Sequence, residues 1–501
     1  MLRLSALFGP GSVLCRNQVI RIFGWSDQQE VSVRLMDGQG RLLAQDRCPV
    51  RDGRFMALLP PQKAMLGCVL TVQAGRETVI SENILIGDVY LAAGQSNMEL
   101  ELQNADEGEQ LISHHQNDQV RYFNVPKIAV PGPENDAAFD KVRWKSVAPH
   151  GARDMSAVAY FFAMKLEKKL QVPVGIIDCY WGGTSIACWM SRETLSRSRE
   201  GQRYLDEYEK LSAGKTMEQY LTEEKEAYAK IRAWEDAAAP YRAENPAIAG
   251  SELEKIIGPY PWKIPDGPGS PWRPSGLYES MTAHLIPVSL TGILYYQGEE
   301  DTWRTEAYDI LLTDFVRMLR RDFLNDSLPF LNTQLPMWID PGAPDSFTWP
   351  RLRLAQERAW RLIRGSSLTC LIDQGEFGNI HPTAKRVVGE RLADSALSLV
   401  YGKTVPLSPR AEDAIPADGK LVVRLSAPVR LAGSGNTLLE IAGEDGQFHP
   451  AEVTAAQDRL ILSSPAVSRP VSARYAWTDY GIVRLFGENG LPLMPFRISV
   501  I

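Results

Sequence analysis

An apolar strand runs directly into a polar turn in the sequence Gly87-Asp88-Val89-Tyr90-Leu91-Ala92-Ala93-Gly94-Gln95-Ser96-Asn97-Met98. A nearly continuous apolar run is typical of a strand that is buried on both faces, as in a parallel sheet. Ser96 follows the strand, two residues after the flexible Gly94, so we expect its hydroxyl to stand at a tight turn on the sheet edge. The pattern predicts a nucleophile; the alternative is that Ser96 only caps the next helix.

The same alternation continues along the middle of the chain. We expect apolar strands at residues 88–92, 174–179, 290–296, 328–332 and 368–372, and helices at 157–170, 306–321, 351–363 and 383–400. Strands that alternate with helices form a doubly wound α/β domain, whose active site lies at the carboxyl ends of the strands. The sequence therefore predicts a catalytic α/β domain over residues 87–402.

Short alternating strands separated by turn signals occupy both ends of the chain. They predict an N-terminal β domain over residues 1–86 and a C-terminal β domain over residues 403–501, both β-sandwich-like. A segment rich in Glu, Lys, Ala and Tyr, followed by a loop rich in Pro, Trp and Gly, interrupts the catalytic domain at about residues 191–275. We interpret it as a helical and loop insertion whose charges form a solvated face and whose aromatic loop is a candidate wall of a substrate cleft.

The composition of the 501-residue chain is that of a globular protein with two or three domains. Hydrophobic residues make up 44% and charged residues 23%, which excludes a disordered or fibrous protein. The 54 Lys and Arg residues against 61 Asp and Glu give a net charge of −7. The sequence also has no block of basic residues of the kind that binds nucleic acid. No apolar run approaches the roughly 18 residues of a membrane helix.

The six cysteines are scattered, with no CxxC pair and no histidine at metal-ligand spacing. This distribution argues against a zinc site and a disulfide framework, and we expect most of the cysteines to be small buried hydrophobic residues. The N-terminal residues 1–8 end at Gly9-Pro10 and are too short for a signal peptide. The chain as written is therefore expected in the cytoplasm, or in the periplasm or outside the cell if a leader precedes it.

Two further strands end in groups that suit the stabilisation of an oxyanion. The paired glycines in Tyr180-Trp181-Gly182-Gly183-Thr184-Ser185 let backbone amides approach a ligand closely. Gln297 follows the third strand, and a side-chain amide is a common oxyanion donor. For Glu299, an acid in an apolar setting, we favour a structural role, in which it accepts amide hydrogens of the nucleophile loop, over proton transfer.

A base for Ser96 is offered by His381 in Asn379-Ile380-His381-Pro382, just before the last helix of the α/β domain. Pro382 suits the first helical position, which would leave His381 at the positive end of the helix dipole. That field disfavours the imidazolium and would keep His381 neutral, able to accept a proton. The alternative is a helix-capping or buried structural histidine.

These segments resemble the signature blocks of the SGNH hydrolases and, more closely, those of the sialate O-acetylesterase-like carbohydrate esterases. The resemblance spans nearly the whole chain and is carried by Leu14-Cys15-Arg16, Gly24-Trp25, residues 87–98, residues 156–162, Pro173-Val174-Gly175, Gly182-Gly183-Thr184 with Trp189, Gly276-Leu277-Tyr278, Gln297-Gly298-Glu299, Ile380-His381-Pro382 and Arg474-Tyr475-Ala476-Trp477. It implies an SGNH-hydrolase fold, in which a flavodoxin-like, doubly wound parallel sheet is flanked by the two β domains.

The resemblance also implies roles for individual residues. Ser96 would be the nucleophile, His381 the base, and the amides of Ser96 and of Gly182 or Gly183, with Gln297, the oxyanion hole. Many SGNH enzymes carry an Asp three residues before the histidine, but position 378 is Gly here. Asp373 and Glu376 are possible replacements; we favour a backbone carbonyl bonded to the second ring nitrogen, which gives a Ser–His dyad.

The expected activity is that of a serine esterase that removes O-acetyl groups from sugars, most simply a sialate O-acetylesterase, without metal or cofactor. The alternatives are a deacetylase for xylan or mannan oligosaccharides and, in another class, a carbohydrate-binding protein on an esterase frame. The residues expected to bind substrate are Gln95, Asn97, Trp181, Gly182 and Trp303, with Trp189, Trp262 and Trp272 as further candidates to stack on sugar rings. No nucleic-acid or membrane partner is expected, and the sequence does not indicate an oligomeric state.

Overall fold

Six parallel strands form the middle of the molecule in the computed structural model, which describes residues 1–245, 248, 250–262 and 264–500. They lie in the order β9-β11-β8-β12-β13-β14, and β10 pairs antiparallel with β9. The strands are β8 (Glu77–Gly94), β9 (Asn117–Asn124), β10 (Lys145–Val147), β11 (Val174–Tyr180), β12 (Gly292–Tyr296), β13 (Phe330–Thr333) and β14 (Ser366–Thr369). The parallel order brings their carboxyl ends to one edge of the sheet.

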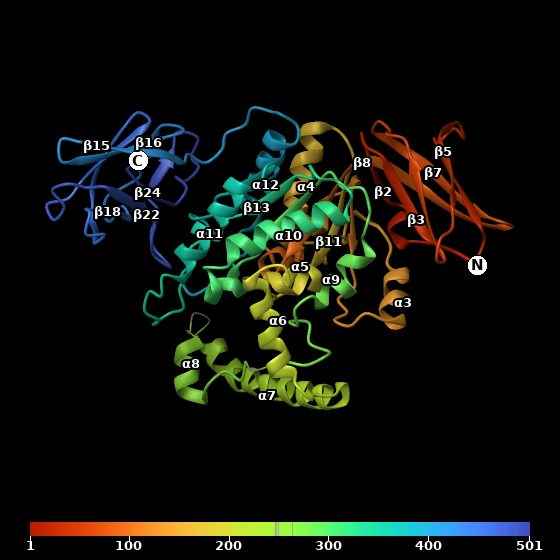
Figure 1. Ribbon diagram of the computed structural model, residues 1–501, viewed down its shortest axis with the longest axis horizontal. Coiled ribbons are helices and arrows are strands. Elements are labelled where there is room, and N and C mark those ends of the chain that lie inside the picture. The colour runs from red at the N-terminus through yellow and green to blue at the C-terminus, as the bar shows by residue number, and fades with distance from the viewer. Residues whose placement is uncertain (246–247, 249, 263, 501) are drawn as a thin grey trace.

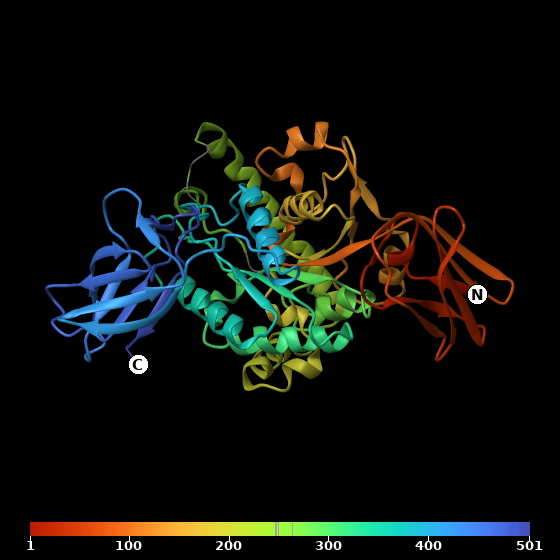
Figure 2. The same ribbon diagram turned by 90° about the horizontal axis from the view of Figure 1, so that it is seen from above.

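Helices cover both faces of this sheet. The helix α4 packs on α12, α10 packs on α11, and Figure 2 shows the two pairs on opposite sides of the sheet. The helices of this part are α1 (Ser96–Glu99), α2 (Gly108–His114), α3 (Pro133–Lys141), α4 (Ala157–Leu170), α9 (Gly276–Ser280), α10 (Tyr308–Asp322), α11 (Thr348–Leu362) and α12 (Lys385–Leu399). The shorter 3-10 helices are η1 (Ala6–Phe8), η2 (Leu102–Asn104), η3 (Ile186–Trp189), η4 (Thr282–His284) and η5 (Glu299–Arg304). The architecture is therefore α/β with a central mixed sheet.

The long helices and five of the parallel strands fall on the segments that the sequence predicts, whereas β9 is missing from the prediction. Its apolar residues are interrupted by Arg121, a charge that hides the strand pattern. The structure buries this guanidinium, which donates to the carbonyls of Gly11 and Asn83 at 2.6 Å each. A buried arginine whose hydrogen bonds come from distant segments gives no local signal.

The N-terminal strands join the central sheet without a break, because β8 is one continuous strand. Its first half pairs antiparallel with β7 and its second half lies between β11 and β12. The N-terminal strands are β1 (Leu2–Leu4), β2 (Val13–Cys15), β3 (Ile20–Ser26), β4 (Glu30–Met36), β5 (Leu42–Pro49), β6 (Arg54–Leu59) and β7 (Met65–Ala74). The predicted division after residue 86 thus falls inside a strand, and one hydrophobic core spans both sides of it.

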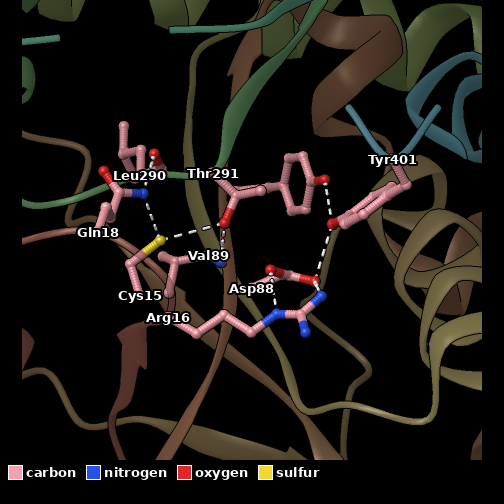
Figure 3. Close-up of polar contacts among 9 residues, drawn as sticks. Cys15, Arg16, Gln18, Asp88, Val89, Leu290, Thr291 and Tyr401 are labelled. Atoms are coloured by element: carbon pink, nitrogen blue, oxygen red, sulfur yellow. Dashed lines mark hydrogen bonds and ion pairs between the residues drawn. The ribbon is translucent and has the colours of Figure 1, made fainter. Parts of the chain in front are cut away.

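A buried polar cluster fastens the N-terminal part to the amino end of the sheet (Figure 3). Asp88 accepts two hydrogen bonds from Arg16, at 2.9 and 3.0 Å, and one from Tyr401 at 2.8 Å. Cys15 Sγ lies 3.1 Å from the Thr291 hydroxyl, which in turn accepts from the Val89 amide at 3.0 Å. The segment before β12 and the segment that follows α12 are thereby tied to β8.

The C-terminal part forms three further antiparallel sheets around a core of its own, at the opposite end of the molecule from the N-terminal strands (Figure 1). That core also takes in Met337, Leu368, Cys370 and Ile372 of the central part. The strands are β15 (Ala411–Ala417), β16 (Lys420–Leu425), β17 (Val429–Leu431), β18 (Leu439–Ala442), β19 (Phe448–Pro450), β20 (Glu452–Ala456), β21 (Arg459–Ser463), β22 (Ser472–Tyr475), β23 (Leu485–Gly487) and β24 (Phe496–Ser499). Residue 501 of the predicted C-terminal domain lies outside the described residues.

The described part of the predicted insertion contains four helices beside the central domain, α5 (Arg192–Leu195), α6 (Arg199–Ser212), α7 (Met217–Glu244) and α8 (Gly250–Ile257), and the aromatic loop follows them. A small core of Trp234, Ala238 and Leu253 holds α7 against α8. Residues 246, 247, 249 and 263 of the predicted insertion lie outside the described residues. The helix α6 contacts η5, which follows β12, since the Tyr204 hydroxyl donates to Asp301 at 2.6 Å.

Candidate active site

The carboxyl ends of β8, β11 and β12 meet around Ser96. Gly94, at the end of β8, has a φ of 143° and lies so close to β12 that a Cβ there would be 2.0 Å from the Tyr296 carbonyl oxygen. Only glycine fits this close approach. The tight contact turns the chain at once, so that Ser96 becomes the first residue of α1 and stands half-buried at the sheet edge.

Ser96 and His381, which are 285 residues apart in the sequence, meet in a hydrogen bond. His381 Nε2 lies 2.8 Å from Ser96 Oγ. Partial burial lowers the pKa of His381, Lys385 lowers it further, and the nearby Glu99 opposes both. A neutral imidazole at this distance can take the proton of the serine hydroxyl.

The predicted helix dipole does not account for this neutral histidine. The helix α12 begins at Lys385, with Ala384 as its N-cap, so Pro382 is not the first helical residue and His381 lies four residues before the helix. That part of the prediction is wrong. The depressed pKa of His381 comes instead from burial and from the positive charge of Lys385.

None of the predicted partners orients the second ring nitrogen of His381. Asp373 forms two hydrogen bonds with Arg391, at 2.6 and 2.7 Å, and Glu376 accepts from Asn379 at 2.7 Å. Among the residues that the structure describes, neither a carboxylate nor a backbone carbonyl bonds to His381 Nδ1. The predicted backbone carbonyl and the alternative contact of Asp373 are therefore both wrong: the Asp373 carboxylate bonds to Arg391 on α12.

Asn97 lies in a buried cluster behind the histidine, not in contact with a substrate site. Its side-chain amide donates to Glu299 at 2.6 Å and to the Ile380 carbonyl at 2.9 Å, and its oxygen accepts from Lys385 at 2.6 Å. This confirms that Glu299 accepts an amide hydrogen of the nucleophile loop, and it corrects the substrate-binding role of Asn97. Burial raises the pKa of Glu299 and lowers that of Lys385 to about 8. Through Ile380 the cluster holds the histidine loop in place.

Gln297 and Gln95 are likewise turned inward. The Gln297 amide donates to the Thr184 carbonyl at 3.1 Å and to Asp301 at 2.5 Å, and its oxygen accepts from Tyr308 at 2.7 Å. Gln95 Oε1 accepts from Gln297 Nε2 and from two amides of the following loop, at 3.2 Å each. Both side chains are almost fully buried. The predictions of Gln297 as an oxyanion donor and of Gln95 as a substrate ligand are therefore not met, because their polar atoms are committed to the loops.

The glycine pair after β11 does lie beside the nucleophile. A Cβ on Gly182 would be 3.4 Å from Ser96 Cβ, and Gly183 has a φ of 67°. The Gly182 amide donates to Glu99 at 2.6 Å, and Glu99 also pairs with Lys127. Within the described part of the chain the Gly183 amide donates to no acceptor, and the Ser96 amide, the first of α1, has no intrahelical partner. Two amides are thus available near the serine.

A cavity of about 360 Å³ opens at Gly183, between α6, the aromatic loop and η5. Trp262, Trp272 and Trp303 line it, and Trp303 is 57% exposed. Trp181 is not among the lining residues and packs against the central core, while Trp189 is buried. Of the tryptophans considered as sugar-stacking candidates, Trp262, Trp272 and Trp303 therefore face a space that a ligand can enter.

Comparisons with known proteins find similarity to carbohydrate esterases. A family model described as a carbohydrate esterase, sialic acid-specific acetylesterase, matches residues 269–398. The sialate O-acetylesterase of Mus musculus is 26% identical over 444 residues, which cover 80% of this chain and 74% of that protein. That of Homo sapiens is 24% identical over 509 residues, or 93% and 86%. The solved structure of a carbohydrate acetylesterase from Xanthomonas citri matches over the full length of both chains, with 28% identity and a TM-score of 0.77. This chain is thus a distant homologue of sialate O-acetylesterases and of a carbohydrate acetylesterase, and part of it matches the sialic acid-specific acetylesterase family of carbohydrate esterases.

Several residues around the serine and the histidine carry no sequence signal. Lys385, Glu99 and Tyr204 come from three different elements and look like ordinary charged or aromatic positions in their own segments. All six cysteines of the esterase lie in described segments, and each is buried with a free thiol. Within the described residues, no helix has the length and apolar character to cross a membrane, and no group of three His, Cys, Asp or Glu side chains is placed to hold a metal ion.

Proposed function

We propose that the esterase removes O-acetyl groups from carbohydrates by way of a covalent intermediate on Ser96. The single observation that carries the proposal is the 2.8 Å contact between Ser96 Oγ and His381 Nε2. Ser96 attacks the acetyl carbonyl while His381 takes its proton; as the ester bond to the sugar breaks, His381 gives the proton to the departing sugar oxygen. Water repeats the sequence on the acetyl-enzyme and releases acetate.

The tetrahedral intermediate needs donors for its negative oxygen. The amides of Ser96 and Gly183 are the candidates that the geometry supports, since both lie near the nucleophile with no acceptor of their own. Backbone amides in place before the reaction need not reorganise as charge develops. The Gly182 amide is held by Glu99 and takes no part in this assignment.

Among the described residues, Glu99 is the carboxylate that stabilises the protonated form of His381. Glu99 raises the pKa of His381, so its carboxylate favours the imidazolium that forms when Ser96 gives up its proton. No acid bonds to the opposite ring nitrogen among the described residues. We therefore assign a Ser–His dyad, with Glu99 as an electrostatic support for the imidazolium.

We further assign the α/β fold of the central part to the SGNH-hydrolase type. If β9 is set aside as an addition, the strands β11-β8-β12-β13-β14 follow the flavodoxin-like order 2-1-3-4-5. Ligands of such folds bind where the strand order reverses, between the first and third strands. Here that point lies between β8 and β12, and Ser96 follows β8 directly.

Acetate release tests the proposal against its alternatives. The substrates are 4-nitrophenyl acetate, 9-O-acetylated sialic acid, and acetylated xylo- and manno-oligosaccharides. A carbohydrate O-acetylesterase releases acetate from at least one of the sugars, and which sugar reacts separates a sialate esterase from a plant-oligosaccharide esterase. Hydrolysis of no ester at all, with sugar binding retained, would support a carbohydrate-binding protein and overturn the proposal.

A further inference from the structure

Glu300 lines the cavity that opens at Gly183, one residue after the glycine that packs against Ser96. Within the described residues the Glu300 carboxyl forms no hydrogen bond or ion pair. Its backbone amide donates to Gln95 Oε1 at 3.2 Å, one residue before Ser96. The backbone is thus fixed to the nucleophile turn, while the carboxyl is left to bond with whatever enters the cavity.

The charges around the cavity favour an uncharged ligand. The charged side chains among its described lining residues are Glu207, Asp266, Glu300 and Arg304. Arg304, the one cation among these described residues, is already engaged: it is paired with Glu207, and its guanidinium lies 4.0 Å from the ring centres of both Tyr204 and Trp303. A sugar that carries a carboxylate would meet the negative charge of Glu300, with which Arg304 forms no ion pair in the described part of the chain.

We propose that Glu300 binds hydroxyl groups of an uncharged acetylated saccharide in this cavity and disfavours sugars that carry a carboxylate. The inference rests on the proposed function and names the substrate class for the same site. A carboxylate accepts two sugar hydroxyls in charge-assisted hydrogen bonds, and Trp262 and Trp303 offer apolar faces for the ring. Glu300 is thereby a specificity-determining residue.

Discrimination between the two sugar classes should depend on pH. Burial, together with Asp301 and Glu299, raises the pKa of Glu300 to about 7, so its carboxyl is neutral below and negative above that pH. The other titratable or charged groups facing it are Glu207, Tyr204 and Tyr208 from α6, Asp266 from the aromatic loop, and Arg304 from η5. Burial raises the pKa of both tyrosines, which stay neutral across this range. Repulsion of an anionic sugar therefore increases as the pH rises through 7.

The experiment compares the wild type with Glu300→Gln, which keeps the shape and one acceptor but removes the charge. The control is Glu306→Gln, an exposed acid just after η5 that does not line the cavity. kcat and KM are measured at pH 5.5 and 8.5 for an acetylated xylo-oligosaccharide, 9-O-acetylated sialic acid and 4-nitrophenyl acetate. In the wild type, the ratio of kcat/KM for the xylo-oligosaccharide to that for the sialic acid should rise by about tenfold between the two pH values.

In Glu300→Gln that rise should vanish, and KM for the xylo-oligosaccharide at pH 8.5 should increase by about fivefold, more than any loss on 4-nitrophenyl acetate. Glu306→Gln should behave as the wild type. The inference is overturned if the variant loses the same factor on all three substrates, or if the wild-type ratio does not change with pH. If the wild type releases acetate from 4-nitrophenyl acetate but from no sugar, the proposed function fails and this inference with it.

Discussion

Polar side chains gather at both ends of the central sheet, and the two groups differ in how completely they are bonded. At the amino end, both oxygens of Asp88 are used by Arg16, and one also accepts from Tyr401. At the carboxyl end, His381 Nδ1 and the Glu300 carboxyl have no partner in the described part of the chain. In the first cluster the hydrogen-bonding groups bond to one another and stabilise the fold. In the second, polar atoms are left that can bond to a ligand.

Removal of the nucleophile should give the largest effect. Ser96→Ala should lower kcat for 4-nitrophenyl acetate by at least roughly a thousandfold, because no other group at this edge is placed to attack the carbonyl. The free energy of unfolding should change by less than about 0.5 kcal/mol, since the half-buried hydroxyl has few structural contacts. Rate and urea unfolding are measured on the same preparation. More than about a tenth of the wild-type rate remaining would contradict the assignment of Ser96.

At the amino end of the sheet, a substitution should lower the free energy of unfolding without changing kcat. Asp88→Asn leaves Arg16 without its acid partner in a nearly closed site, and breaking a buried pair typically costs about 3 kcal/mol or more. The free energy of unfolding measures this loss, while kcat per folded molecule should stay within about twofold. Glu30→Gln, which removes an exposed pair with Arg47, is the control and should change stability by under about 1 kcal/mol. A selective loss of kcat in Asp88→Asn would show that the two ends are coupled.

Glu99 gives an intermediate test at the carboxyl end. Glu99→Gln keeps an acceptor for the Gly182 amide but removes the carboxylate that raises the pKa of His381. The base is active when neutral, so kcat/KM rises with pH as His381 loses its proton, and without Glu99 this limb should move to lower pH. The plateau rate should fall by less than about tenfold, because the imidazolium loses one charge contact. A limb that moves to higher pH would contradict the assigned role.

The smallest effect is expected at Asp373. Asp373→Asn should lower kcat/KM by less than about threefold, because this carboxylate bonds to Arg391 and not to His381. An orienting acid would behave otherwise, since its amide counterpart typically costs about four orders of magnitude in rate. Steady-state kinetics on 4-nitrophenyl acetate separate the two cases. A loss of a thousandfold or more would show that Asp373 reaches the histidine during turnover.

At the carboxyl end, the sequence predicts where residues lie better than it predicts which atoms their side chains contact. The sequence predicts that Ser96, Gly182 and Gly183 lie at the carboxyl edge of the sheet, and they do. Each follows an apolar strand, and the end of a parallel strand determines the position of the next residues. It does not fix which way a side chain turns. Gln95, Asn97 and Gln297 all follow strands as predicted, yet their polar atoms point into the loops behind the site.

A partner from another segment explains why the contact expected of Asp373 is absent. Asp373 is eight residues from His381, but Arg391 on α12 binds it instead. The predicted N-terminal boundary falls inside β8 because a change from alternating to continuous apolar residues resembles a domain junction. In the structure the same change marks the point where one face of a continuous strand becomes covered.

Covalent labelling tests the central claim, that Ser96 is the nucleophile activated by His381, most directly. The intact chain is treated with a fluorophosphonate, which forms a stable adduct with an activated serine, and the modified residue is located by peptide mass spectrometry. We predict one adduct, on Ser96, with labelling that is lost in His381→Ala, where the proton acceptor 2.8 Å from Ser96 Oγ is gone. An adduct on another serine, or labelling of Ser96 at an undiminished rate in His381→Ala, would contradict it.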